Sequence, residues 1–258
     1  MKITVLTENT AGRNCLAEFG LSYFIEADKK ILFDTGSTDV FRVNADRIGI
    51  SPDEADMIVL SHGHWDHGNG LKYIENKPLL THPGSFRKRY SNKDNRYVGL
   101  DMSIESAKEK FELITSRIPF EISPEITFLG EIPRLNNFES QQTYFYFDDK
   151  SDDFVSDDSA IVVKTNKGLV VISGCAHAGI CNTIDYACKV TGTEKVFAVI
   201  GGFHLKGDNE VTHKTIQYMK QKNIEQVYPS HCTALPALVG FSREYKIYQV
   251  LTGDIFYF

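Results

Sequence analysis

Short apolar runs alternate with amphipathic stretches from one end of the chain to the other. The runs have the length of β-strands, and most are rich in the β-branched and aromatic residues that favour strands. The predicted strands are Ile3–Leu6, Ser22–Glu26, Ile31–Phe33, Met57–Leu60, Ile126–Leu129, Tyr144–Phe147, Ala160–Lys164, Leu169–Ile172, Val196–Ile200, Gln226–Tyr228 and Ile247–Leu251.

Amphipathic stretches between these runs predict helices. In one of them Val211, Ile216 and Met219 share a face with polar residues around it, which is typical of a half-buried helix. Hairpins come first and strand–helix units later, so we expect an α/β protein with two sheets and helices outside them. The predicted helices are Thr38–Ile48, Gly70–Glu75, Ser103–Glu109, Ile180–Val190, Val211–Lys222 and Leu235–Arg243.

Composition narrows the class of protein. The chain has 258 residues, of which 42% are hydrophobic and 24% charged, and no low-complexity linker divides it, so we predict one domain over residues 1–258. The formal charge of -6 argues against nucleic-acid binding by bulk electrostatics. No apolar stretch is long enough to span a bilayer, and the N-terminus lacks the apolar core of a signal peptide. We therefore expect a cytoplasmic protein whose five cysteines are thiols.

Two stretches of opposite charge are predicted to be loops. Residues 83–99 are basic, and residues 148–158 carry six Asp and one Lys, which sum to -5 and account for most of the net charge. A solvated loop is the simplest interpretation of both. The alternative for the basic stretch is an insertion or rim loop, around residues 83–120, that contacts an anionic substrate through Arg87, Lys88, Arg89 and Arg96.

The strongest chemical signal is the sequence His62-Gly63-His64-Trp65-Asp66-His67, directly after an apolar strand. Four side chains that can ligate metals fall within six residues. Gly63 and Gly68 favour a tight turn. From such a turn, His62 and His64 can point to one metal ion and Asp66 and His67 to another. This pattern predicts two metal ions.

Further polar residues follow apolar strands in the same way. Asp34 closes the strand at 31–33, while His177, His204 and His231 follow the strands that begin at 169, 196 and 226. Ligands at strand ends are held by rigid elements and can converge on one rim. We expect His177 and His231 to be ligands and His204 to contact substrate or serve as an extra ligand. His82 and His213 are expected to lie outside the site.

The sequence resembles the metallo-β-lactamase-fold hydrolases. The resemblance rests on the motif at 62–67, on Asp34-Thr35-Gly36, and on the later motifs around His177, His204 and His231. These later motifs are most similar to the subgroup named for 7,8-dihydropterin-6-methyl-4-(β-D-ribofuranosyl)aminobenzene 5'-phosphate synthase. The resemblance implies a four-layer αββα sandwich, with two mixed sheets flanked by helices.

The resemblance also implies a set of ligands. His62, His64 and a third histidine would hold one ion, and Asp66, His67 and His231 the other, while Asp34 would orient a ligand histidine. The bridging Asp of the superfamily is replaced here by Cys175, and the usual third histidine is absent, so His177 is its best substitute. Cys175 is either a soft ligand, which favours zinc, or a small buried residue.

The expected activity is hydrolysis by a metal-activated water. Two divalent ions, zinc before manganese or iron, would make water nucleophilic and polarise an ester or phosphoester, with Asp66 and His204 as catalytic residues. The expected substrate is a small phosphate-bearing anion. One alternative is the named synthase reaction, which releases pyrophosphate, and another is a non-catalytic metal- or ligand-binding protein. The sequence gives no indication of oligomeric state.

Overall fold

The computed structural model describes residues Met1–Phe258 and divides into two compact units. Unit 1 contains residues 1–117, 143–157 and 251–257, and unit 2 contains residues 118–142, 158–250 and the last residue. Because the chain passes between the units more than once, no single linker marks them in the sequence. None of the helices is both long and apolar enough to cross a membrane.

Unit 1 contains a seven-stranded mixed sheet in the order β16-β1-β2-β3-β4-β5-β7. The strands from β1 to β3 are antiparallel, whereas β3, β4, β5 and β7 run parallel. Parallel neighbours place the carboxyl end of β3 beside that of β4. The strands are β1 (Lys2–Thr7), β2 (Ser22–Glu26), β3 (Lys30–Phe33), β4 (Met57–Val59), β5 (Pro78–Thr81), β7 (Glu112–Thr115) and β16 (Ile255–Tyr257).

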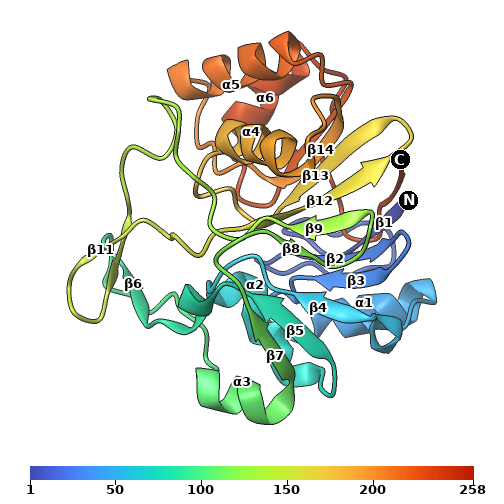
Figure 1. Ribbon diagram of the computed structural model, residues 1–258, viewed down its shortest axis with the longest axis vertical. Coiled ribbons are helices and arrows are strands. Elements are labelled where there is room, and N and C mark those ends of the chain that lie inside the picture. Colours follow the sequence, from blue (N-terminus) through green and yellow to red (C-terminus); the bar gives the residue numbers. More distant parts are fainter. The chain divides into compact units, whose positions relative to one another are not determined.

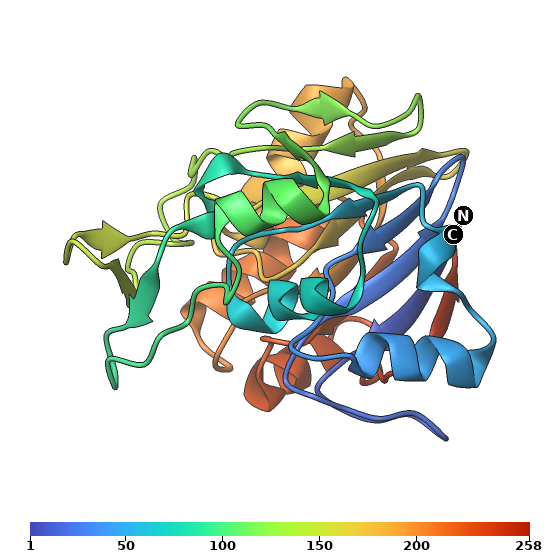
Figure 2. The same cartoon turned by 90° about the horizontal axis from the view of Figure 1, so that it is seen from below.

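Helices of unit 1 cover apolar side chains of this sheet. Helix α1 packs against β1 through Phe41 and Ala45, which belong to a buried cluster with Leu6 and Leu32 (Figure 2). The remaining helical segments are short. They are α1 (Val40–Ile48), α2 (Trp65–Gly68), α3 (Ile104–Lys110) and the 3₁₀ turns Pro52–Glu54, Asn69–Tyr73 and Pro83–Phe86.

A second, three-stranded sheet of unit 1 joins the basic and acidic stretches. Strand β6 (Arg89–Ser91) pairs antiparallel with β10 (Phe145–Phe147), and β10 pairs with β11 (Asp152–Asp153). Figure 1 shows these strands side by side in an arm that extends from the larger sheet of the unit. The two stretches are therefore partners in one sheet, and the interpretation of both as simple solvated loops is wrong.

Unit 2 is built on a six-stranded sheet in the order β15-β14-β13-β12-β9-β8. Strands β13, β14 and β15 are parallel neighbours, so their carboxyl ends meet at one edge. Helices α4, α5 and α6 pack together beside this sheet (Figure 1). The elements are β8 (Phe120–Glu121), β9 (Ile126–Phe128), β12 (Ala160–Thr165), β13 (Gly168–Ser173), α4 (Ile180–Thr191), β14 (Val196–Gly202), α5 (Glu210–Gln221), β15 (Gln226–Ser230) and α6 (Leu235–Ser242).

One predicted strand is wrong. Residues Ile247–Leu251 form no strand, although their apolar pattern is real: Val250 is buried and Ile247 packs against the core of unit 2. The chain passes there from unit 2 to unit 1, and the strand that closes the sheet is β16, which pairs with β1. The predicted strand Ser22–Glu26 is present with the same ends, and the other predicted strands are present with shifted ends. The predicted helix Gly70–Glu75 is replaced by the 3₁₀ turn Asn69–Tyr73.

Candidate metal centre

A first group of candidate ligands, in unit 1, is organised by Asp34 at the end of β3. Its carboxylate oxygens accept hydrogen bonds from the Ser61 backbone N–H and hydroxyl, both at 2.7 Å. The same carboxylate lies 2.7 Å from Nδ1 of His67. All three residues are fully buried, so Asp34 ties the loop after β4 to the ring of a histidine on α2.

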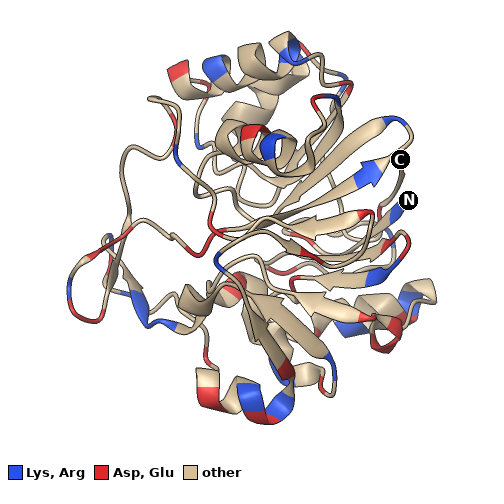
Figure 3. Cartoon of the chain, in the orientation of Figure 1, with Lys and Arg blue, Asp and Glu red and all other residues tan.

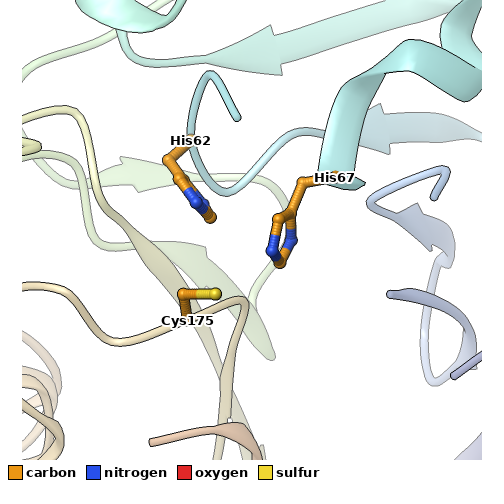
Figure 4. A group of neighbouring side chains, drawn as sticks. All are labelled: His62, His67 and Cys175. Carbon is orange, nitrogen blue, oxygen red and sulfur yellow. The ribbon is translucent and has the colours of Figure 1, made fainter. Parts of the chain in front are cut away.

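These contacts fix the tautomers of two histidines. A carboxylate only accepts hydrogen bonds, so Nδ1 of His67 carries the proton and its Nε2 keeps a lone pair. The Ser61 hydroxyl gives its proton to Asp34 and lies 2.9 Å from Nδ1 of His62, which must therefore be the donor to that oxygen. Nε2 of each ring therefore carries a lone pair that can bind a metal ion, and that of His62 also lies 2.9 Å from Nδ1 of His64. Figure 4 shows the two rings next to each other. Their centroids are 4.3 Å apart and their planes are tilted by 50°.

His64 and Asp66 complete the group in unit 1. Nδ1 of His64 lies 2.9 Å from Nε2 of His62, and an Asp66 oxygen lies 3.8 Å from Nε2 of His67. Burial, and then the nearby Arg89 charge, lower the pKa of His64 to about 3. A histidine that stays neutral at physiological pH is in the form that binds metals.

Arg89, in the basic stretch, stabilises the loop that carries His62 and His64 through a buried ion pair. Its guanidinium lies 2.8 Å from Asp157, whose other oxygen accepts the backbone N–H of Gly63 at 2.7 Å. A Cβ on Gly63 would lie 1.8 Å from the carbonyl oxygen of Ser85, so only glycine fits between the two histidines. Arg89 and Asp157 are buried, and the structure places Arg89 under the metal motif and not on an exposed rim.

The other predicted substrate residues are exposed. The Arg87 guanidinium stacks 3.3 Å from the Phe147 ring centroid, and that of Arg96 lies 5.8 Å from the Trp65 ring centroid. Lys88 is exposed beside Arg87. Figure 3 shows both Lys or Arg and Asp or Glu on the arm that contains β6 and β11. Phe19 stacks on Trp65 and is 54% exposed.

A second group of candidate ligands lies in unit 2, at the edge where β13, β14 and β15 end. Cys175 and His177 follow β13, His204 follows β14, and His231 follows β15. The rings of His177 and His204 have centroids 4.3 Å apart. Ala176, His204 and His231 adopt positive φ angles of 50° to 52°, a conformation that costs a residue with a side chain about 1 to 3 kcal/mol. All three strand-end loops therefore hold a strained backbone.

Three side chains hold the loop of His177, and the sequence marked only one of them, Asp158, as part of the acidic stretch. The Ser140 hydroxyl donates to the carbonyl of His177 at 2.6 Å, and Asp158 accepts the N–H of Ala178 at 2.9 Å. Glu139 accepts the N–H groups of Cys181 and Asn182 at the start of α4. Burial raises the pKa of Glu139. No motif marks any of the three for this role, so only the tertiary structure reveals it.

Cys232 is a further site residue that sequence reasoning missed, although its position directly after His231 was a signal. Its sulfur accepts the backbone N–H of His204 at 3.3 Å. Burial raises the pKa of the Cys232 thiol, but hydrogen bonds from Cys175 and His204 outweigh burial and hold it well below the usual value of 9.0. Such a thiol ionises readily.

The remaining histidines have structural partners. Nδ1 of buried His82 accepts the N–H of Gly84, and exposed His213 pairs with Asp208 at 2.7 Å. Cys181 and Cys188 pack in the core of unit 2, and all five cysteines are free thiols. These placements agree with the roles expected from the sequence.

The donors of each group suit divalent metal ions. Neutral imidazoles with defined lone pairs and a nearby carboxylate form the ligand set of zinc and related ions. Asp34 occupies the place of the outer carboxylate that orients a ligand histidine in such sites. The residues present therefore fit the metal centre that the motif implies.

Comparisons with known proteins agree with this chemistry. The family model described as "Metallo-beta-lactamase superfamily" matches residues 16–231. A 7,8-dihydropterin-6-methyl-4-(β-D-ribofuranosyl)aminobenzene 5'-phosphate synthase of Methanocaldococcus jannaschii is 34% identical over 95% of this chain and 92% of its own. An uncharacterised protein of the same organism is 33% identical over 93% and 94%.

Among solved structures, a metal-dependent hydrolase of the beta-lactamase superfamily, Tm1679, superposes with a TM-score of 0.90. It is 29% identical to this chain, and the match covers 100% of this chain and 99% of that one. The expected fold is therefore confirmed, and the chain belongs to the metallo-β-lactamase superfamily.

Proposed function

We propose that this protein is a metal-dependent hydrolase that cleaves an ester or phosphoester bond of a small, phosphate-bearing molecule. The observation that carries the proposal is the buried chain of contacts from Asp34 to His67 and, through Ser61, to His62. It fixes the tautomers of two imidazoles so that Nε2 of each carries the lone pair that can bind a metal ion. A purely structural cluster of histidines has no need for such a defined set of tautomers.

Both groups of candidate residues would supply ligands. We assign His62, His64 and His177 to one ion and Asp66, His67 and His231 to the other. Membership of the superfamily supports this division, as do the positions of His177 and His231 after strands β13 and β15. When bound, two such ions supply a water nucleophile at neutral pH and stabilise the charge that develops on the attacked group.

The residues of the chain would have separate tasks. Asp66 would orient the attacking water as well as ligate. His64, neutral because of its burial, would bind its ion without first losing a proton. Arg87, Lys88 and Arg96, which are exposed on one stretch, would attract the phosphate of the substrate. Arg89 has no part in this task because it is buried under the loop of His62 and His64.

A direct test compares metal content and turnover. The chelator-treated protein is reloaded with zinc or manganese and assayed on paired substrates that differ only in a phosphate group. We expect about two ions per chain and turnover that prefers the phosphorylated member of each pair. Loss of both ions in His62→Ala, with unchanged turnover, would exclude metal-dependent hydrolysis. Equal turnover of both members would remove the preference for phosphate.

A second candidate is the synthase reaction of the relative from M. jannaschii. The observation that favours it is the 34% identity over nearly the whole of both chains. This reaction joins two anionic substrates and releases pyrophosphate, so it also needs exposed basic residues. Pyrophosphate release only when both substrates are present would identify the synthase, and phosphate or alcohol release from one substrate would identify the hydrolase.

A further inference from the structure

Unit 2 contains a compact group of soft ligands, which we call the thiol cluster: Cys175, His204 and Cys232. Each member follows one of three neighbouring parallel strands, β13, β14 and β15. Because parallel neighbours end at the same edge of the sheet, residues far apart in sequence converge there. The cluster lies entirely within one unit, and it shares no residue with the ligands assigned above.

The spacing of the cluster matches a metal ion. The two Sγ atoms and a ring nitrogen of His204 all lie within 4.8 Å of one another. In a tetrahedral zinc site, Zn–S bonds of about 2.3 Å and Zn–N bonds of about 2.0 Å place donor atoms about 3.5 to 3.8 Å apart. Small rotations of the side chains would therefore bring the donors to coordinating distance.

Two glycines make room for this convergence. A Cβ on Gly202 would lie 2.6 Å from the sulfur of Cys232 and 3.1 Å from Cα of Cys175. Gly201 adopts a φ angle of 123°, and a Cβ there would lie 2.0 Å from the carbonyl oxygen of Ser173. Any side chain at position 202 would thus fill the space between the two cysteine-bearing loops.

His204 adopts an unfavourable conformation in this cluster. It has a φ angle of 52°, which is uncommon for a residue with a side chain. Its Nδ1 atom is buried and makes no hydrogen bond, while its backbone N–H donates to the sulfur of Cys232. A buried ring nitrogen without a hydrogen bond is unfavourable in a polar loop, and coordination is one way to satisfy it.

We propose that the thiol cluster is a further metal site, which binds zinc or another thiophilic divalent ion through Cys175, His204 and Cys232. Two thiolates and one imidazole leave a fourth position open, as in zinc sites that exchange a ligand. Binding displaces the two thiol protons to solvent and changes no oxidation state. Cys175 thereby has a role as a soft ligand although it replaces the bridging Asp of the superfamily.

Cobalt substitution tests the site on the full-length protein. The chelator-treated, reduced protein is titrated with Co²⁺ alone, and the thiolate-to-cobalt charge-transfer absorption is followed. We expect a strong band in the wild type, and its loss in Cys175→Ser and in Cys232→Ser, each with one fewer bound equivalent. Cys188→Ser, which alters a thiol buried against the core of the same unit, is the matched control and should keep the band.

Two results would overturn the proposal. If Cys232→Ser keeps the wild-type band and stoichiometry while Cys175→Ser loses them, Cys175 alone is a ligand and the cluster is not a site. X-ray absorption of the zinc-loaded wild type needs no variant: we expect sulfur at about 2.3 Å from zinc, and a spectrum without sulfur excludes the site. His62→Ala should keep the cobalt band, so failure of the proposed hydrolase centre is distinguishable from failure of this one.

Discussion

Oδ2 of Asp34 lies 2.7 Å from Nδ1 of His67, although 33 residues separate them in sequence. The contact exists because β3 and β4 are parallel neighbours: Asp34 ends one strand, and the loop that leads to His67 leaves the other. The carboxylate also holds the backbone and the hydroxyl of Ser61. One buried side chain therefore sets the path of the loop and the orientation of a ligand ring.

Asp34→Asn is expected to weaken metal binding by about 10- to 100-fold, as for other carboxylates that orient ligand histidines. The amide would present a donor toward Nδ1 of His67, which would move the proton to Nε2 and block the ligand atom. Competition with a chromophoric zinc chelator measures the affinity, and the thermal midpoint shows whether the fold is retained. Asp28→Asn, an exposed carboxylate in the same unit, is the control. Equal affinities of the two variants would contradict the role of Asp34.

The buried pair of Arg89 and Asp157 predicts a large effect on stability. Asp157→Asn should lower the free energy of unfolding by about 3 to 5 kcal/mol, because the Arg89 charge would remain buried without its closest partner. Urea denaturation measures the loss. Arg87→Gln removes an exposed guanidinium two residues away and should change stability by no more than about 0.5 kcal/mol. A small loss in Asp157→Asn would show that Asp153, 3.4 Å from Arg89, suffices to balance its charge.

The same pair shows where sequence reasoning succeeds and where it stops. The motif at 62–67 and the strand-end positions of Asp34 and His177 could be recognised because ligand spacing and strand ends are local features. The burial of Arg89 could not be recognised, because its partner Asp157 lies 68 residues away in a stretch that also has the pattern of a charged loop. Glu139 and Ser140 were missed for the same reason: they act on α4 and on the carbonyl of His177 from a loop without any motif.

Arg96 predicts a selective effect on substrate binding. Its guanidinium lies over the ring of Trp65, which directly follows His64. If it contacts the phosphate of the substrate, Arg96→Gln should raise KM by about fivefold, which corresponds to an exposed ion pair of about 1 kcal/mol, and leave kcat unchanged. Lys93→Gln, an exposed cation in the same stretch, should leave both unchanged. Trp65 is the only tryptophan of the chain, so its fluorescence can report binding independently of turnover.

The pKa of His64 predicts how the metal-free protein responds to acid. Burial lowers this pKa from 6.5 to about 3, so between these values the unfolded chain binds a proton that the folded protein does not. Stability contributed by neutral His64 is therefore complete above pH 6.5 and is lost as the pH falls toward 3, by at most about 1.4 kcal/mol per pH unit.

Urea denaturation of chelator-treated protein between pH 7 and pH 4 measures this slope. His64→Gln should remove the part of the slope that His64 contributes. His213→Gln alters an exposed imidazole paired with Asp208 and should leave the slope unchanged. Bound metal should make the free energy of unfolding depend more steeply on pH, because protonation of the ligands then also displaces the ion. An identical slope in His64→Gln and the wild type would mean that His64 is protonated in the folded protein. It would then bind metal only after losing that proton.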